Sequence, residues 1–173
     1  MSETGPVITI LMDKPLHLTA RGAWEHGGQP FTNTAVADLF SRSVQFAPKF
    51  AENVACWVVK IAAQRTQFTF ADTPIFVTAL SEEGVATLSS SAYEPLAYPS
   101  YQFIIEANHA WYLTSASLPT KARLMPALQQ QLSGLIESGP VTSAMPAGSA
   151  PPVHIALSRC KIALTDNAAK VVS

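Results

Sequence analysis

The chain has 173 residues, a size that suits one domain with a single core or two small lobes that share a seam. Charged residues make up only 13% of the chain, the net charge is −1, and neither sign clusters, so nucleic acid and anionic membrane surfaces are excluded as expected partners. With 48% hydrophobic residues and so few charges to cover them, we expect apolar surface to be buried in a homo-oligomer.

The chain begins with a segment that does not resemble a secretory signal. Glu3 precedes a short apolar run at 7–12, and no cationic region stands before it. No apolar stretch reaches the length of a membrane span. Cys56 and Cys160 have neither CxxC spacing nor a neighbouring histidine cluster, so we expect both to be reduced and buried. These features predict a cytoplasmic protein.

A short β-hairpin is predicted next. Residues 16–21 alternate between apolar and polar side chains, as in a strand with one buried face. Gly22 suits the turn, and Trp24 and His26 alternate along a return strand. That strand ends at Gly27-Gly28, a pair that can adopt the positive φ angles of a tight turn.

An amphipathic helix follows the hairpin. Candidates for its N-cap are Thr32, Asn33 and Thr34, whose side-chain oxygens can accept from the first free N–H groups. Apolar residues then recur at helical spacing through 36–47, and Pro48 stops the helix. We expect three to four turns, packed on the hairpin.

The centre of the chain is predicted to be β-rich. Residues 55–63 form an apolar run of strand length, and 68–80 are rich in aromatic and β-branched side chains. A turn at 81–84 and a short strand at 85–88 complete three or four antiparallel strands. The stretch 89–100, rich in serine, proline and tyrosine, is the expected seam between lobes.

The last part of the chain alternates strands with one helix. Two strands are predicted at 101–106 and 110–114, with Asn108 at the positive-φ turn position between them. Apolar residues recur at helical spacing through 118–138. Pro126 interrupts this region, which indicates either a turn at 120–125 with a helix that begins at Pro126, or a kinked helix. After a loop, residues 153–157 and 161–164 are expected to form either a last strand pair or a single bulged strand.

Together these elements predict an α+β fold with an antiparallel β-rich core and two main helices, which could form two small lobes. Residues 1–90 would hold the hairpin, the first helix and a sheet. Residues 91–173 would hold a β-rich lobe with one helix and the Pro/Gly-rich loop at 139–152.

The sequence carries no recognisable catalytic set. The four histidines lack the spacing of metal ligands, no GxSxG elbow is present, and the glycines before the first helix match no phosphate-binding loop. We therefore assign no catalytic residue, metal or cofactor.

The candidate ligand-binding residues are Arg21, Trp24, His26 and Asp72. The first three could line a groove on the hairpin, although packing of Trp24 over the first helix is the preferred interpretation. Asp72 precedes Thr-Pro, so a role in forming a turn is preferred for it.

Two motifs resemble those of a known family. They are Gly22-x-Trp24-x-His26-x-Gly28-x-Pro30, followed by Leu39-Phe40, and Phe70-Ala71-Asp72-Thr73-Pro74-Ile75. This order is similar to the bacterial domain-of-unknown-function 1285 family, over residues 16–80. Ala71 and Ile75 stand where the family has Glu and Phe, so the resemblance is to a divergent member. The family carries no established activity, and the resemblance therefore implies none.

We expect a non-enzymatic cytosolic module that binds a small ligand or a protein partner. The alternative is a hydrolase or isomerase that uses His26 or His109 with Asp72, which requires these side chains to meet in one cleft. A third possibility is a structural subunit of a larger assembly.

Overall fold

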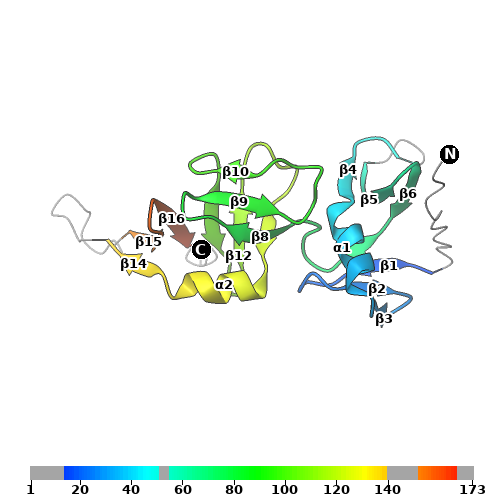
Figure 1. The fold of residues 1–173 in the computed structure, drawn as a ribbon, viewed down its shortest axis with the longest axis horizontal. Coiled ribbons are helices and arrows are strands. Elements are labelled where there is room, and N and C mark those ends of the chain that lie inside the picture. Colours follow the sequence, from blue (N-terminus) through cyan, green and yellow to red (C-terminus); the bar gives the residue numbers. More distant parts are fainter. Residues whose placement is uncertain (1–13, 51–54, 140–151, 167–173) are drawn as a thin grey trace, which may run out of the picture.

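The protein has two lobes that lie end to end along its long axis (Figure 1). The structure, a computed structural model, describes residues 14–50, 55–139 and 152–166. Two helices and mostly antiparallel strands make it an α+β fold with a β-rich core, as the sequence predicts. None of the helices in these ranges is long and apolar enough to cross a membrane.

The smaller lobe contains the predicted hairpin. Strands β1 and β2 pair antiparallel with Leu18 opposite Trp24, and Gly22 in their turn has a φ of 82°. Gly27 and Gly28 also have positive φ and lead into β3. The elements of this lobe are β1 (Leu16–Leu18), β2 (Trp24–His26), β3 (Gln29–Pro30), α1 (Thr34–Arg42), β4 (Val44–Ala47), β5 (Cys56–Ile61), β6 (Gln64–Gln67) and β7 (Thr69–Phe70).

Helix α1 begins where it was predicted and ends earlier. Asn33 is its N-cap, and the Asn33 Oδ1 accepts from the backbone N–H groups of Ala35 and Val36. The predicted continuation to residue 47 is wrong, because the helix ends at Arg42 and the next residues form β4. The backbone of β4 forms its hydrogen bonds with β5. The spacing of apolar residues along a segment gives no information about such a distant partner, so it could not predict this strand.

Trp24 lies at the centre of the smaller lobe and is only 1% exposed. Its ring meets Phe40 of α1 and Phe68 edge-on, at centroid distances of 5.7 and 5.0 Å. Its Nε1 donates to the Ser41 Oγ at 2.9 Å, so the one polar atom of the indole is satisfied. The tryptophan therefore fixes the hairpin to the helix, as the packing interpretation predicts.

The larger lobe is built on one nine-stranded sheet with the order β10-β9-β8-β13-β12-β11-β16-β15-β14. Leu128 and Leu132 of α2 are buried in its core. The elements are β8 (Phe76–Leu80), β9 (Val85–Leu88), β10 (Leu96–Ala97), β11 (Gln102–Ile105), β12 (Trp111–Thr114), β13 (Ala122–Leu124), α2 (Pro126–Ser133), β14 (Ile136–Ser138), β15 (Val153–Ala156) and β16 (Lys161–Asp166). Since β8 and β9 belong to this sheet, the change of sheet falls between β7 and β8, earlier in the chain than the predicted boundary at residue 90.

Two alternatives were predicted for Pro126, and the one in which a helix begins at this residue is confirmed, because Pro126 is the first residue of α2. The turn expected at 120–125 is wrong, because residues 122–124 form β13 between β12 and β8. The helix also stops at Ser133, and Ile136 begins the edge strand β14. Both strands exist through pairing with distant segments, which a helical pattern does not reveal. The predicted loop at 139–152 lies almost wholly outside the described residues.

The turn between β11 and β12 has the predicted position and a different conformation. His109, with a φ of 60°, occupies the left-handed region in place of Asn108. The Asn108 Oδ1 instead accepts from the Ala110 N–H at 3.0 Å, and this bond fixes the turn.

The serine-rich stretch after β9 contacts the smaller lobe, although the chain passes from one lobe to the other earlier, between β7 and β8. The Ser90 hydroxyl donates to the Val44 carbonyl, and the Ser91 hydroxyl donates to the Arg42 carbonyl at 2.8 Å. The N–H of Phe46 donates to the Tyr93 hydroxyl at 3.2 Å. These bonds attach the larger lobe to the end of α1 and to β4.

Substitution of two glycines that both have positive φ, Gly84 and Gly28, tests how closely each turn packs against the rest of the protein. Gly84 has a φ of 79°, and a Cβ there would lie 3.1 Å from the Tyr98 Cβ and 2.8 Å from the Cys160 Sγ. Gly28 has a φ of 77°, and apart from its two chain neighbours no residue has a heavy atom within 4 Å of such a Cβ. We expect Gly28→Ala to lower the free energy of unfolding by about 1 kcal/mol from backbone strain, and Gly84→Ala by about 2–4 kcal/mol because crowding adds to it.

Urea denaturation of both variants measures this difference. Equal losses of stability in the two variants would show that the Gly84 turn does not pack as closely against Tyr98 and Cys160 as described.

Candidate ligand-binding site between the lobes

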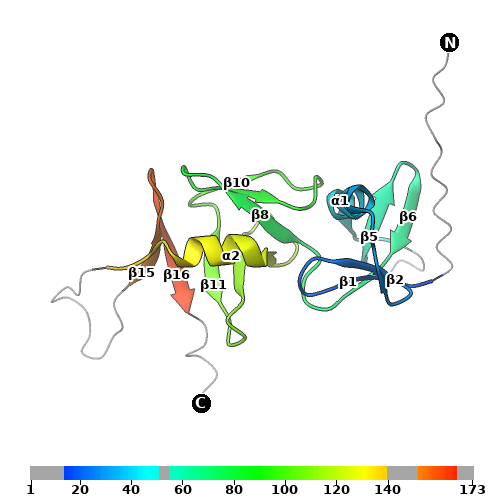
Figure 2. The same ribbon diagram turned by 60° about the horizontal axis from the view of Figure 1, so that its bottom comes forward.

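The turn between β1 and β2 reaches toward the start of α2 (Figures 1 and 2). A pocket of about 430 Å³ is lined by residues of this turn and of α2. The smaller lobe contributes Arg21. The larger lobe contributes polar side chains from the β11–β12 turn, from β13 and from α2, namely Asn108, His109, Arg123, Gln129, Gln130 and Ser133. Ala110 and Pro126 complete the lining, so the pocket has both polar and apolar walls and is built from both lobes.

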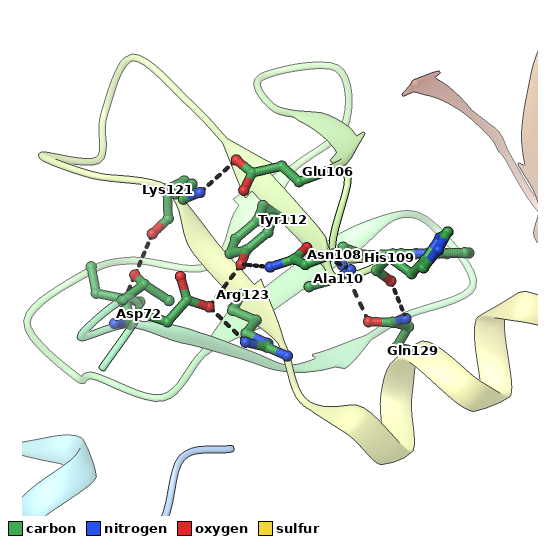
Figure 3. Close-up of polar contacts among 12 residues, drawn as sticks. Asp72, Glu106, Asn108, His109, Ala110, Tyr112, Lys121, Arg123 and Gln129 are labelled. Atoms are coloured by element: carbon green, nitrogen blue, oxygen red, sulfur yellow. Dashed lines mark hydrogen bonds and ion pairs between the residues drawn. The ribbon is translucent and has the colours of Figure 1, made fainter. Parts of the chain in front are cut away.

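Arg123 is held in place from behind by Asp72. Its Nη1 donates to the Asp72 Oδ2 at 2.7 Å, and the two side chains are only 20% and 17% exposed (Figure 3). The Tyr112 hydroxyl donates to the same carboxylate oxygen at 2.7 Å. Burial raises the pKa of Tyr112 above its ordinary value, so this hydroxyl keeps its proton and remains a donor. Asp72 thus fixes the guanidinium at one side of the pocket.

Two of the three amide side chains of the pocket, those of Gln129 and Asn108, are also held in place. The Gln129 Oε1 accepts from the Trp111 N–H at 3.2 Å, and its Nε2 donates to the His109 carbonyl at 2.9 Å. The Asn108 Nδ2 donates to the Tyr112 hydroxyl at 3.3 Å. Figure 3 shows these contacts linking α2 to the β11–β12 turn. The pocket wall is consequently ordered by the protein itself.

The four predicted site residues lie in three places. Arg21 lines the pocket between the lobes, and Asp72 lies behind Arg123 at the same site. Trp24 is buried in the smaller lobe and lines no described pocket. His26 lines a separate pocket of about 350 Å³, together with Phe31 and Val36. The structure therefore brings Arg21 and Asp72 together, without Trp24 and His26.

The arrangement required by the hydrolase or isomerase alternative is not present among the described contacts. The described partners of Asp72 are Arg123 and Tyr112. Figure 3 places the side chain of His109 away from Asp72, beyond Asn108, and His26 belongs to the other pocket. Within the described ranges, no group of three histidine, cysteine or acidic side chains is placed to hold a metal ion.

A second groove, of about 520 Å³, also reaches the β1–β2 turn. Gly22 lines it, together with residues of α1, β8 and β9. Its floor includes the apolar side chains of Phe76, Leu88 and Met125. The Arg21 pocket and this groove are thus neighbours at the junction of the lobes.

The fold and the pocket define a two-lobed α+β protein with a candidate ligand-binding site at the lobe junction. No family model matches the sequence, and no curated protein matches it. The chain is similar to two solved structures. One is a DUF1285 family protein from Silicibacter pomeroyi, with a TM-score of 0.51 and 15% identity over 95% of this chain and 90% of that chain. The other is a DUF1285 family protein from Shewanella baltica, with a TM-score of 0.44 and 11% identity over 71% of this chain and 93% of that chain.

The chain therefore has the fold of the Silicibacter pomeroyi protein over almost its whole length. This likeness agrees with the resemblance to the DUF1285 family drawn from the Trp24 and Asp72 motifs. At this level of identity the likeness concerns the fold alone.

Proposed function

We propose that the protein is a non-enzymatic cytoplasmic module that binds a small ligand in the pocket between Arg21 and Arg123. The observation that carries the proposal is that both lobes contribute polar side chains to one pocket of about 430 Å³. That volume lies within the range of typical small-molecule sites.

The order of the pocket wall supports binding. Arg123, Asn108 and Gln129 are each fixed by hydrogen bonds to other parts of the larger lobe. A side chain that is already ordered loses little conformational entropy when a ligand arrives, so its contacts contribute more to affinity. The lining contains one histidine, His109, and no carboxylate or thiol, which supports binding in preference to catalysis.

Occlusion of the pocket tests this proposal. We expect a thermal-shift screen against small metabolites to find compounds that raise the melting temperature, because a ligand that binds only the folded state stabilises it. Ser133→Phe, which places a ring in the pocket without changing its charge, should abolish the shift. Gln131→Phe is the matched control, since Gln131 is exposed on the same helix and does not line the pocket.

Two outcomes would contradict the proposal. One is a library that leaves the melting temperature of the wild type unchanged. The other is a set of compounds whose shifts persist in Ser133→Phe, which would place the ligand elsewhere. The homo-oligomer expected from the composition and a protein partner stay predictions.

A further inference from the structure

We infer that the ligand is a small carboxylate anion whose charged group lies between Arg21 and Arg123 and therefore contacts both lobes. This inference rests on the proposed function and assigns the chemical class of its ligand. Three features of the pocket carry it: the balance of charge, the hydrogen-bonding capacity that the lining leaves unused, and the origin of the two arginines in different lobes.

The pocket has an uncompensated positive charge. The charge of Arg123 is opposed by Asp72 at 2.7 Å. Within the described ranges, no carboxylate lies within ion-pair distance of Arg21, and none lines the pocket. One paired and one unpaired guanidinium leave a net charge of about +1 at the site, which favours a ligand with a single negative charge.

The two anchored amides of the lining, those of Asn108 and Gln129, each have an unused donor. The oxygen of each amide already accepts a backbone N–H: the Gln129 Oε1 from Trp111 and the Asn108 Oδ1 from Ala110. Each amide nitrogen donates one hydrogen in the described contacts and has a second hydrogen to offer. The pocket therefore presents N–H groups, which suit a ligand rich in acceptor oxygens.

Arg123 adds donors of the same kind. Its Nε is buried and its Nη1 contacts Asp72, so a ligand would meet the guanidinium through its terminal nitrogens. Figure 3 shows the guanidinium on the side of Asp72 that faces Gln129 and α2. A planar carboxylate matches donors that converge from an arginine and an amide.

Arg21 is exposed and comes from the turn between β1 and β2, whereas the other polar groups belong to the larger lobe. A carboxylate that accepts from both arginines would therefore connect the two lobes, and this turn would be the contact on the smaller lobe. Binding should therefore depend on Arg21 even though Arg123 and the amides form most of the wall.

Four probes of small size test the class of ligand: succinamate, succinamide, 4-aminobutanamide and inorganic phosphate. The first three share a chain length and an amide and differ in charge. The readout is the NMR signals of the Gln129 and Asn108 side-chain amides in the full chain. We expect succinamate to shift these signals with at least ten-fold higher affinity than succinamide, and 4-aminobutanamide to leave them unchanged.

Two variants test whether the ligand contacts both lobes. Arg21→Gln should weaken succinamate binding at least five-fold, because it removes the uncompensated charge from an exposed position where folding is unaffected. Arg159→Gln removes an exposed arginine that pairs with Glu83 outside the pocket, and it should leave the affinity unchanged. Unchanged affinity in Arg21→Gln would overturn the contact with both lobes.

The remaining outcomes separate the inference from the proposed function. If succinamide binds as tightly as succinamate and shifts the same signals, the inference of an anionic ligand is wrong, whereas the proposal that the pocket binds a ligand is retained. Tighter binding of phosphate than of succinamate would overturn the carboxylate in favour of a phosphate group. If none of the four probes shifts the Gln129 or Asn108 signals while the screened compounds bind elsewhere, both proposals fall.

Discussion

Replacement of Trp24 by alanine will lower the free energy of unfolding by about 3–5 kcal/mol, the usual cost of deleting a large aromatic side chain from a packed core. The indole is 1% exposed and contacts the rings of Phe40 and Phe68, which come from the helix and from the segment before β7. Its loss would leave a cavity between the hairpin and α1. Urea denaturation followed by circular dichroism measures the change.

Two further variants make this prediction specific. Trp24→Phe keeps an aromatic ring and loses the bond to Ser41, so it should cost less than the alanine variant. Phe70→Ala removes an aromatic side chain that is 36% exposed, and it should cost about 1 kcal/mol. A loss below 1 kcal/mol for Trp24→Ala would contradict the structural role of this residue. With so small a loss, Trp24 would again be a candidate ligand-binding residue.

Replacement of Asp72 by alanine will lower the free energy of unfolding by about 2–4 kcal/mol. The substitution leaves the Arg123 guanidinium, which is four-fifths buried, without its counter-ion, and it leaves the Tyr112 hydroxyl without its acceptor. Removing one partner of a buried ion pair is costly because the remaining charge stays desolvated. The measurement is again urea denaturation, at low and at high salt.

An exposed ion pair provides the control. Arg159 and Glu83 approach to 2.6 Å, and their side chains are 67% and 51% exposed. Glu83→Ala should change the stability by less than about 0.5 kcal/mol, since solvent screens such pairs. Asp72→Ala in an Arg123→Met background should cost much less than in the wild type. Equal effects of Asp72→Ala in both backgrounds would show that the two residues do not interact as described.

Local features of the fold could be predicted from the sequence where one residue type fixes the conformation of the backbone around it. Gly22 marks a turn through its positive φ, Asn33 caps a helix with its side chain, and Pro126 suits only the first turn of a helix. Each of these signals acts within a few residues of itself. The end of α1 and the strand β13 were missed because they depend on pairing with distant strands.

Two of the four predicted site residues, Arg21 and Asp72, lie at the site, and both could be singled out for a similar reason. Arg21 and Asp72 stand beside or within motifs that shape turns, so sequence patterns single them out. Arg123, Asn108 and Gln129 lie in three separate segments with no shared motif, and only the tertiary fold brings them together. Trp24 was a candidate because aromatic side chains build both pockets and cores, and burial decides between the two.

A crystal structure of the protein soaked in succinamate tests the central claim most directly. The account predicts electron density in the pocket between the lobes, with the carboxylate within hydrogen-bond distance of Arg21 and Arg123. Density in the groove lined by α1, β8 and β9, with the Arg21 pocket empty, would contradict it.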